Sequence, residues 1–554
     1  MTSQVGGCFA ALCVLQCVLL VAYASTSTST TTTSTTTTPT TTTTTTTPVP
    51  ITTTVKPTTT EAPYLVKAYP DLRSRAPKKN DRIAIVGATI QGIHLAVSLM
   101  DAGFPDVNVY ESSRRIGGEG FSVYFNGQSF LLGETYVFDE EGVAAKFNKR
   151  FESTTLMPVP NPSIWINNTT KLSFMEYLLK VAKDVSPTAN LNSGNIVKHY
   201  QTLLSTYMAV VKNNFGDYKG HMMRRPLDSE LTRLSKKNFL KLLQDNKIEA
   251  LKSVFQIMLS SIGGGDIAEL PALYGCMFIN SRMATVLYEK LGNGKPIASV
   301  FKKGIQHVME EATKMLNVDV KFDHETNEID RSSRGYFNLY YKKEYVKTDS
   351  KKSRCSKGYF KRKFDHVFIA TEPYEFKSLI TKPNADLMNT LDTMTSKFQT
   401  YNLLRTNITT PGERLHEQFA FNNYGDYNVQ SCLDNVKHTG PNVNPNEKFT
   451  VCLQESELSN RTLLAEAMYS HITEMDYSLM NPNSNTSVED TRKSFQRWEV
   501  EMFGNKEMAT GNLWKLMHKQ GEDGLWIISR AASFPYADVT FDYNTRLLKS
   551  MGVI

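Results

Sequence analysis

The stretch Arg82–Gly118 reads RIAIVGATIQGIHLAVSLMDAGFPDVNVYESSRRIGG and decides the fold of this chain. It begins with Arg82–Gly87, a short run rich in Ile and Val that is typical of a buried parallel strand. A helical pattern follows, and a second apolar strand, Val107–Tyr110, ends on the acid Glu111. A strand, a helix and a strand whose acid stands 19 positions after Gly92 form the layout that holds an adenosine diphosphate group.

The glycine-rich turn after the first strand departs from the usual fingerprint at one position. The fingerprint is G-x-G-x-x-G, and the chain reads Gly87-Ala88-Thr89-Ile90-Gln91-Gly92. Gly87 suits the tight turn, and Gly92 lets the helix and the strand pack closely. Thr89, however, puts a branched side chain where backbone should approach phosphate. We expect a strain of about 1–3 kcal/mol there unless the loop moves to absorb it.

A second turn follows the acid and adds groups of the right chemistry for a pyrophosphate. Glu111 can accept hydrogen bonds from both ribose hydroxyls of an adenosine. Arg115 and the amides of Gly117 and Gly118 can hold the second face of the phosphates. The order and spacing of these groups together predict a dinucleotide site, although any one glycine alone predicts only a turn.

The length and net charge of the chain limit its domain number and its possible partners. The chain has 554 residues, enough for two or three domains, and a net charge of +7. Part of that excess lies in Lys342–Lys363, KKEYVKTDSKKSRCSKGYFKRK, which favours a flexible basic hairpin loop over a polyanion site. Aromatic and basic residues do not interleave as they would in a nucleic-acid groove, so we expect no nucleic-acid partner.

The N-terminal segment has the pattern of a secretory signal over residues 1–24. Phe9–Ala24 is apolar and ends in Ala22-Tyr23-Ala24, with small residues where signal peptidase needs them. The stretch is short for a bilayer, so we expect a secreted protein with no stable membrane span, and an uncleaved anchor is the alternative. Residues 25–79 are Thr- and Pro-rich and predict a disordered, mucin-like stalk and linker. Five sequons agree with secretion: Asn167, Asn168, Asn407, Asn460 and Asn485.

Cysteine usage fits an oxidising compartment. Loss of the signal would leave Cys276, Cys355, Cys432 and Cys452, which allow three pairings. Cys432 with Cys452 is the most local candidate disulfide. No Cys or His spacing suggests zinc, and we expect no metal site.

The rest of the chain divides by pattern into alternating segments. We expect a nucleotide domain in residues 80–150, a mostly helical insertion in 151–300, a return to the nucleotide domain in 301–380, a substrate domain in 381–520 and a closing nucleotide segment in 521–554. Within 381–520 the pattern suggests strands around Phe419–Phe421 and Phe449–Leu453 and a helix at Thr491–Met502. The fold class is therefore α/β, with a discontinuous α+β substrate domain that is partly a helical insertion.

The order of these segments resembles the FAD-dependent amine oxidases and their relatives over roughly residues 81–554. The branch similar to β-cyclopiazonate dehydrogenase is the nearest in pattern, through Leu270–Tyr274 after a glycine cluster. Six segments correspond in order to the family's motifs: Gly87–Gly92, Glu111–Gly118, Leu131–Gly133, Thr326–Ile329, Asp365–Thr371 and Leu525–Met551. The resemblance implies a Rossmann-like FAD-binding domain of amine-oxidase type.

The resemblance also implies particular residues for the cofactor site. FAD would be held non-covalently by Gly87, Ala88, Thr89, Gly92, Glu111, Arg115, Gly117, Gly118, Gly133, Glu134, Thr135, Thr326, Ala370 and Thr371. Catalytic groups are not identified by any motif. Glu134 is a candidate polar group beside the flavin, and Trp526 and Tyr536 are candidates for a wall of the substrate pocket, although both also suit an aromatic core.

Three positions depart from the family's pattern at the same ligand. Thr89 is one, and Glu119 is another, because it stands where family members usually carry Arg. The third is the C-terminal motif, which resembles A-G-D/E in the family and here reads Ile528-Ser529-Arg530 and continues to Pro535 without glycine. No cysteine follows Cys452, so a C-terminal covalent flavin link is not available.

These observations support three functions. The first is a secreted FAD-dependent oxidoreductase that oxidises a small molecule by hydride transfer to flavin, with oxygen as acceptor. The second is a catalytically inactive relative that serves as an extracellular binding or structural glycoprotein, which the three departures favour. The third is a thioether-cleaving flavoenzyme similar to prenylcysteine oxidase. Substrate identity and oligomeric state are not encoded in any motif.

Overall fold

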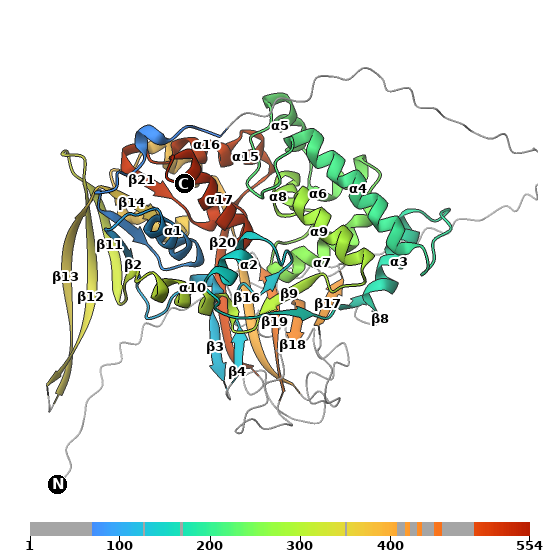
Figure 1. Cartoon of the computed structure of the whole chain (residues 1–554), viewed down its shortest axis with the longest axis horizontal. Coiled ribbons are helices and arrows are strands. Elements are labelled where there is room, and N and C mark those ends of the chain that lie inside the picture. The colour runs from blue at the N-terminus through green and yellow to red at the C-terminus, as the bar shows by residue number, and fades with distance from the viewer. Residues whose placement is uncertain are drawn as a thin grey trace, which may run out of the picture. The chain divides into compact units, whose positions relative to one another are not determined.

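The computed structural model describes residues 69–125, 128–166, 170–349, 352–406, 416–420, 429–434, 448–456 and 492–554 (Figure 1). The expected signal, the stalk up to residue 68 and the five sequons lie outside the described residues. The folded domain begins before residue 80: Leu72 is buried, and its N–H donates to the carbonyl oxygen of Ser550 in the last helix. The linker expected over 25–79 is therefore wrong in its last part, because the Leu72 side chain is apolar and packs in the core.

A five-stranded parallel sheet forms the centre of the nucleotide domain. Its order is β10-β2-β1-β14-β21, and every neighbouring pair is parallel. The strands are β1 Ile83–Val86, β2 Val107–Tyr110, β10 Asp319–Lys321, β14 His366–Ile369 and β21 Leu525–Ile527. The expected strand–helix–strand start and the two later strands therefore come together, although they lie hundreds of residues apart in sequence. Strands β1 and β14 are buried on both faces, which explains their continuous apolar runs.

Helices from three parts of the chain pack beside this sheet. Helix α1, Ile90–Asp101, contacts both α10, Gly304–Met315, and the C-terminal helix α17, Ala537–Ser550. Figure 1 shows α17 near α1, and the two helices are in contact. The last helix therefore belongs to the nucleotide domain, as the sequence predicts.

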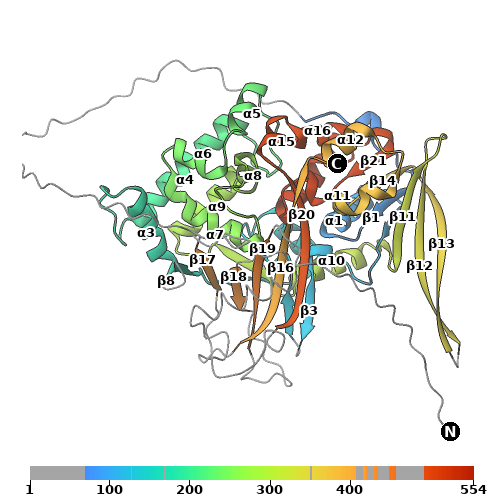
Figure 2. The same cartoon turned by 180° about the vertical axis from the view of Figure 1, so that it is seen from behind.

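A second sheet extends from the nucleotide domain as a long ribbon (Figures 1 and 2). Its order is β13-β12-β11-β15, and its strands are β11 His324–Arg331, β12 Phe337–Asp349, β13 Lys352–Phe364 and β15 Ile380–Thr381. Strands β12 and β13 pair antiparallel from Phe337↔Phe364 to Asp349↔Lys352. The described part of the basic run thus forms the expected hairpin, and its two arms are paired strands.

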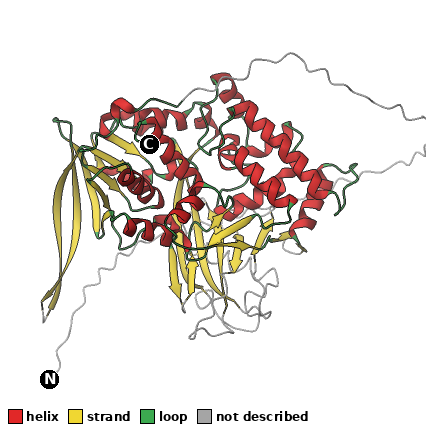
Figure 3. Ribbon diagram, in the orientation of Figure 1, coloured by secondary structure: helices red, strands yellow, loops and turns green. Residues whose placement is uncertain are grey.

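The helical insertion occupies one side of the domain (Figure 3). Its helices are α3 Phe174–Val185, α4 Ile196–Phe215, α5 Asp228–Leu234, α6 Phe239–Asp245, α7 Lys252–Ile262, α8 Ala272–Phe278 and α9 Ser281–Gly292. The helix α3 begins with a reciprocal cap, in which Ser173 and Glu176 bond each other's backbone N–H groups.

The substrate domain is built on a seven-stranded sheet of order β20-β16-β19-β18-β17-β7-β8. Its strands are β7 Ser163–Ile166, β8 Thr170–Leu172, β16 Met394–Thr406, β17 His416–Ala420, β18 Val429–Asp434, β19 Lys448–Ser456 and β20 Arg492–Phe503. The expected helix at Thr491–Met502 is wrong. Trp498, Val500 and Met502 alternate with polar residues, and this period of two is the signal of a strand.

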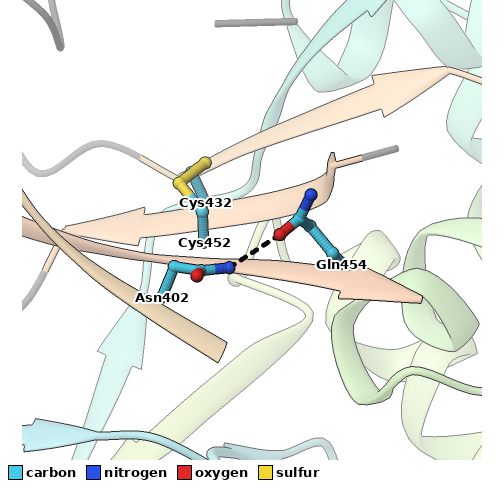
Figure 4. Close-up of a disulfide and its surroundings, with 4 residues drawn as sticks. All are labelled: Asn402, Cys432, Cys452 and Gln454. Carbon is cyan, nitrogen blue, oxygen red and sulfur yellow. Dashed lines mark hydrogen bonds between the residues drawn. A yellow bond between two sulfur atoms is a disulfide. The ribbon is translucent and has the colours of Figure 1, made fainter. Parts of the chain in front are cut away.

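A disulfide between Cys432 and Cys452 joins neighbouring strands of this sheet (Figure 4). Both cysteines are buried and lie opposite each other in the β18–β19 register. Beside them Asn402 Nδ2 donates to Gln454 Oε1 over 2.8 Å, so β16 and β19 are also linked through side chains. The pair that is most local in sequence is therefore the pair that the fold brings together.

Smaller elements complete the domain. Two further sheets contain β3 Ser122–Phe125 with β4 Gln128–Leu131, and β5 Tyr136–Val137, β9 Ala298–Phe301 and β6 Leu156–Val159. The remaining helices are α2 Val143–Arg150, α11 Pro373–Phe376, α12 Ala385–Leu391, α15 Asn505–Ala509 and α16 Asn512–Lys519. Within the described ranges, none of the helices has both the length and the apolar character that a bilayer span needs.

Candidate functional site

The turn between β1 and α1 has the geometry of a phosphate-facing loop. Gly87 has a φ of +101°, which favours glycine, and a Cβ at Gly92 would lie 2.2 Å from the carbonyl oxygen of Gly87. Thr89 has a φ of −69° and a ψ of 174°, so its backbone is ordinary and the expected strain is absent. Its Oγ1 accepts the N–H of Gly92 and donates to the carbonyl oxygen of Ala370, each over 3.2 Å. Thr89 is therefore the N-cap of α1.

Glu111, at the end of β2, folds back onto this turn. Its Oε2 accepts the N–H of Ala88 over 2.9 Å, and its Oε1 accepts the N–H of Ser113 over 2.8 Å. Oε1 also accepts a long bond of 3.5 Å from the Ser112 hydroxyl, and Oε2 keeps a lone pair for a hydroxyl group of a ligand. The Glu111 carbonyl oxygen accepts the N–H of His324, which places the start of β11, and with it Thr326 two residues further on, beside the end of β2.

The second glycine turn is held against the first. Gly117 has a φ of +104°, and its N–H donates to the carbonyl oxygen of Ala88 over 2.7 Å. The Arg115 guanidinium donates to the Gly118 carbonyl oxygen over 2.7 Å and lies 4.4 Å from the ring centre of Phe121. Burial lowers the pKa of Arg115, but an arginine stays charged. The residues predicted for the adenosine and pyrophosphate end thus gather in one place.

Buried polar atoms without partners surround the carboxyl ends of the central strands. Thr371 and Glu372 follow β14, and Ser529 follows β21. In the described part of the chain, no hydrogen-bond partner exists for three side-chain atoms there: Thr371 Oγ1, Glu372 Oε2 and Ser529 Oγ. Open α/β sheets bind ligands at this edge, and buried polar groups normally have partners. The three atoms therefore mark a place for a polar ligand or for water.

A buried arginine lies among these groups. The Nε of Arg530 lies 3.2 Å from Glu372 Oε1 and 3.9 Å from Glu119 Oε1, and one terminal nitrogen donates to the carbonyl oxygen of Glu499 over 3.1 Å. Burial raises the pKa of Glu372 to about 8, although Arg530 opposes the shift. Glu372 therefore holds its proton at neutral pH.

The segment Gly133–Thr135 passes beside this cluster, as the resemblance implies. A Cβ at Gly133 would lie 1.7 Å from the carbonyl oxygen of Glu119, so only glycine fits there. Glu134 Oε1 accepts the N–H of Ala537 at the start of α17. Burial raises the pKa of Glu134 to about 8, and the bond from Ala537 opposes the shift. The Thr135 hydroxyl donates to the Gly133 carbonyl oxygen over 2.7 Å.

The two aromatic candidates are both buried, and they lie in different surroundings. Trp526 stacks on Phe368 and donates from its ring nitrogen to His366 over 3.2 Å, which places it in the core of the sheet. The structure therefore gives Trp526 no place in a substrate wall, because β21 turns it inward. The Tyr536 hydroxyl accepts the N–H of Phe138 over 3.2 Å, and Tyr536 stands directly before α17.

Gln399, a buried residue of β16, lines two cavities. The first measures about 10 Å³ and is lined by Glu119, Glu134, Thr135, Ile262, Gln399, Tyr401, Trp498, Arg530 and Pro535. The second measures about 190 Å³ and includes Gly263, Gly264, Pro271, Lys397, Gln399 and Phe503. The Gln399 side-chain nitrogen donates to the carbonyl oxygens of Ile262 and Gly263. The first cavity holds about one water molecule, and the second has room for a small organic group.

The residues at this edge fit some parts of FAD better than others. The glycine turns, Glu111, Arg115 and the unpartnered hydroxyls of Thr371 and Ser529 fit an adenosine and a pyrophosphate. Beside Glu134 and Arg530 polar groups are also present, but side chains fill the space. The cavity of about 10 Å³ there is too small for a ring system as the side chains stand.

Sequence reasoning missed Glu372, Gln399 and the contacts of Arg530. A signal for two of them was available. Glu372 and Arg530 each stand three residues after the last residue of a buried parallel strand, Ile369 and Ile527. Charged residues at that position lie at the edge where α/β sheets bind ligands. Gln399 has no such signal, because its importance depends on the packing of β16 against the loop after α7.

Comparisons with known proteins agree with this architecture. The family described as flavin containing amine oxidoreductase matches residues 91–399, which is more than half of the chain. Tryptophan 2-monooxygenase of Agrobacterium tumefaciens (strain Ach5) is 32% identical over 84 residues, which are 15% of this chain and 11% of that protein. The protein of Agrobacterium vitis with the same name is 31% identical over 84 residues and the same shares. The matched segment thus spans about a tenth of those relatives.

Solved structures share the fold over most of the chain. A CLA-producing fatty acid isomerase from P. acnes has a TM-score of 0.64 at 14% identity, covering 86% of this chain and 99% of that chain. Cyclohexylamine oxidase from Brevibacterium oxydans IH-35A has a TM-score of 0.55 at 12% identity, covering 85% and 98%. A putrescine oxidase bound to putrescine has a TM-score of 0.56 at 12% identity, covering 84% and 98%. These likenesses show the shared fold, and the family match over more than half of the chain shows that the chain belongs to the flavin containing amine oxidoreductases.

Proposed function

We propose that this chain is a secreted FAD-dependent oxidoreductase that oxidises a small molecule by hydride transfer to the flavin, with oxygen as acceptor. One observation carries the proposal. Three buried polar atoms without a hydrogen-bond partner, those of Thr371, Glu372 and Ser529, lie at the carboxyl edge of the parallel sheet, where the β1–α1 turn and Glu111 also end. Buried polar atoms at such an edge normally bond to a ligand or to ordered water, and FAD offers the polar groups for these bonds.

Different residues of this chain would bind different parts of the cofactor. Glu111 would bind the ribose hydroxyls, and the amides at the start of α1 and the Arg115 guanidinium would bind the pyrophosphate. When bound, the flavin supplies the redox chemistry by accepting a hydride. No cysteine follows Cys452, which is in the disulfide, so the C-terminal segment would hold FAD without a covalent bond.

The substrate would be a small molecule that enters from the side of the larger cavity. That cavity shares the lining residue Gln399 with the smaller cavity beside Glu134. Gly263 and Gly264 also line it and contribute no side chains. The Lys397 ammonium lies 3.3 Å from Glu455 and 3.7 Å from Glu269, so this wall also carries charge. The chain's part in turnover would be to orient the substrate and to exclude water, since flavin oxidation needs few acid–base groups.

The visible spectrum of the purified secreted protein tests the proposal. Two absorbance bands, in the near-ultraviolet and the blue, are expected, and heat-denatured protein should release FAD into solution. A folded, colourless protein that takes up no added FAD would rule the proposal out. Detection of the protein in the medium, with N-terminal sequencing of the secreted form, tests the signal over residues 1–24.

The lack of space for a ring system beside Glu134 and Arg530 favours a second function. An inactive relative that serves as an extracellular binding or structural glycoprotein would keep the fold and would not need space for a ring system. The Arg530 side chain and its two carboxylate neighbours fill that space in the structure. The same spectrum separates the two functions, because only the first needs the flavin.

A further inference from the structure

Three ionisable side chains from three distant segments meet inside the carboxyl edge of the parallel sheet. Glu119 lies in a short turn of helix, Gly118–Gly120, after the second glycine turn, Glu372 follows β14, and Arg530 begins a turn of helix after β21. Their exposed fractions are 5%, 8% and 5%. Removing such charges from water costs several kcal/mol per ion, so the contacts between them must offset that cost.

Two of these residues are departures that look independent in the sequence. Glu119 takes a position where the resemblance implies Arg, and Arg530 takes a position where it implies an acid. The structure shows that the two side chains face each other, with Arg530 Nε 3.9 Å from Glu119 Oε1. Both signs are therefore the reverse of those that the resemblance implies, and in this chain the two side chains carry opposite charges and face each other.

We infer that Glu119 and Arg530 are an exchanged ion pair, and that Arg530 now supplies the positive charge with which this edge meets the anionic part of a dinucleotide cofactor. The second half of the inference rests on the proposed function, and the first half does not. The departures at Glu119 and Arg530 are therefore one compensated change, and they are not two independent losses of cofactor-binding groups.

The surrounding groups agree with this assignment. Glu119 Oε1 and Glu372 Oε2 have no hydrogen-bond donor in the described chain, although both carboxyl groups are buried. Arg530 uses Nε and one terminal nitrogen for Glu372 and Glu499, and a guanidinium carries five N–H donors. Glu372 holds its proton at neutral pH because burial raises its pKa to about 8. One carboxylate, that of Glu119, then faces one guanidinium.

A double-mutant cycle tests the ion pair without any cofactor. Glu119→Arg and Arg530→Glu each place like charges together in a buried site, and we expect each to lower Tm by about 5 °C or more. The double variant Glu119→Arg/Arg530→Glu should recover at least half of the summed loss. Losses that simply add in the double variant would overturn the exchange.

The matched control lies at the opposite edge of the same strands. Arg82 and Asp365 form an ion pair at the amino ends of β1 and β14, with two contacts of 2.9 Å. The double variant Arg82→Asp/Asp365→Arg should also recover part of the Tm that its two single variants lose. Where the charge-reversed variants of Glu119 or Arg530 do not fold, Glu119→Gln, Arg530→Gln and their combination complete the same cycle with smaller losses.

The neutral variants also decide which side chain serves the cofactor. FAD is titrated into protein freed of nucleotide, and binding is followed by the visible band. Arg530→Gln should weaken binding by about tenfold or more, Glu119→Gln should not weaken it, and the Arg82/Asp365 reversal should leave it unchanged. Weaker binding in Glu119→Gln with normal binding in Arg530→Gln would overturn the assignment. If the wild-type protein takes up no FAD, the proposed function and this assignment fail together, and the stability cycle still decides the ion pair.

Discussion

Thr89 illustrates how a residue that breaks a motif can still belong to the site. The sequence suggests strain at this position, but the backbone is extended, and the hydroxyl caps the helix whose N-terminus faces the ligand edge. The methyl group packs against the second turn, where a Cβ at Gly118 would lie 3.0 Å from it. The Thr89 side chain therefore fills space between the two turns and stabilises the start of the helix.

Substitution of Thr89 should separate these two effects. Thr89→Ala removes the cap and should lower the free energy of unfolding by about 1 kcal/mol, whereas Thr89→Gly should cost only a few tenths because glycine is tolerated at an N-cap. Thr89→Ser keeps the hydroxyl and is the control. Urea denaturation monitored by circular dichroism measures all three. A loss as large for Thr89→Ser as for Thr89→Ala would show that the cap is unimportant.

The buried carboxyl groups predict a pH dependence of stability. The pKa of Glu372 is raised from 4.5 to about 8 by burial, so the folded state holds this proton more tightly than the unfolded chain. Its contribution to stability is complete below about pH 4.5 and is lost as the pH rises through about 8.

The free energy of unfolding of the wild type should therefore fall between about pH 5 and about pH 9. Glu372→Gln, which cannot lose a proton, should show a shallower fall. Glu141→Gln, at an exposed position, should keep the wild-type slope. Equal slopes for the wild type and Glu372→Gln would mean that Glu372 is already ionised at neutral pH.

At the scale of elements, the nucleotide domain follows closely from sequence because its signals are local. The strand Ile83–Val86, the helix after it and the strand His366–Ile369 each carry a continuous apolar pattern, and helix–strand alternation implies a parallel sheet. The strand Arg492–Phe503 was mistaken for a helix, because its charged residues mask the alternation and its partner β16 lies about a hundred residues earlier.

The site could be predicted only in part, for a physical reason. Residues in the two glycine turns have motifs, since backbone approach to phosphate restricts what can stand there. Glu372 and Gln399 have none, because their positions depend on strand order and on packing between domains. The partnership of Glu119 with Arg530 needs the fold, which brings residues 411 positions apart to within 4 Å.

The disulfide makes a prediction about the substrate sheet. It closes a loop with a sequence separation of 20 residues between β18 and β19. The chain-entropy estimate for such a loop is about 3 kcal/mol, so the Cys432→Ser/Cys452→Ser variant should unfold at a lower temperature. Calorimetry of the secreted variant measures the loss. Cys276→Ser, at the buried free cysteine, controls for the removal of a thiol. An unchanged Tm in the double variant would show that pairing within the sheet alone holds these strands.

At the scale of the whole molecule, the parts of the site come from every segment of the nucleotide domain. Residues near 87, 111, 134, 371 and 530 meet only when the first strand, the inserted strands and the C-terminal segment assemble around one sheet. The C-terminal segment 525–550 completes both the sheet and the crevice. Loss of this segment should therefore remove cofactor binding and stability together.

The most direct measurement for the account is a calorimetric titration of FAD into the purified protein after bound nucleotide has been removed. The account predicts one saturable site per chain, binding at least about tenfold weaker in Glu111→Ala, and unchanged binding in Asp184→Asn on the exposed face of α3. No binding to the folded wild-type protein, or equal binding by the Glu111→Ala variant, would contradict a cofactor site at the carboxyl edge of the parallel sheet.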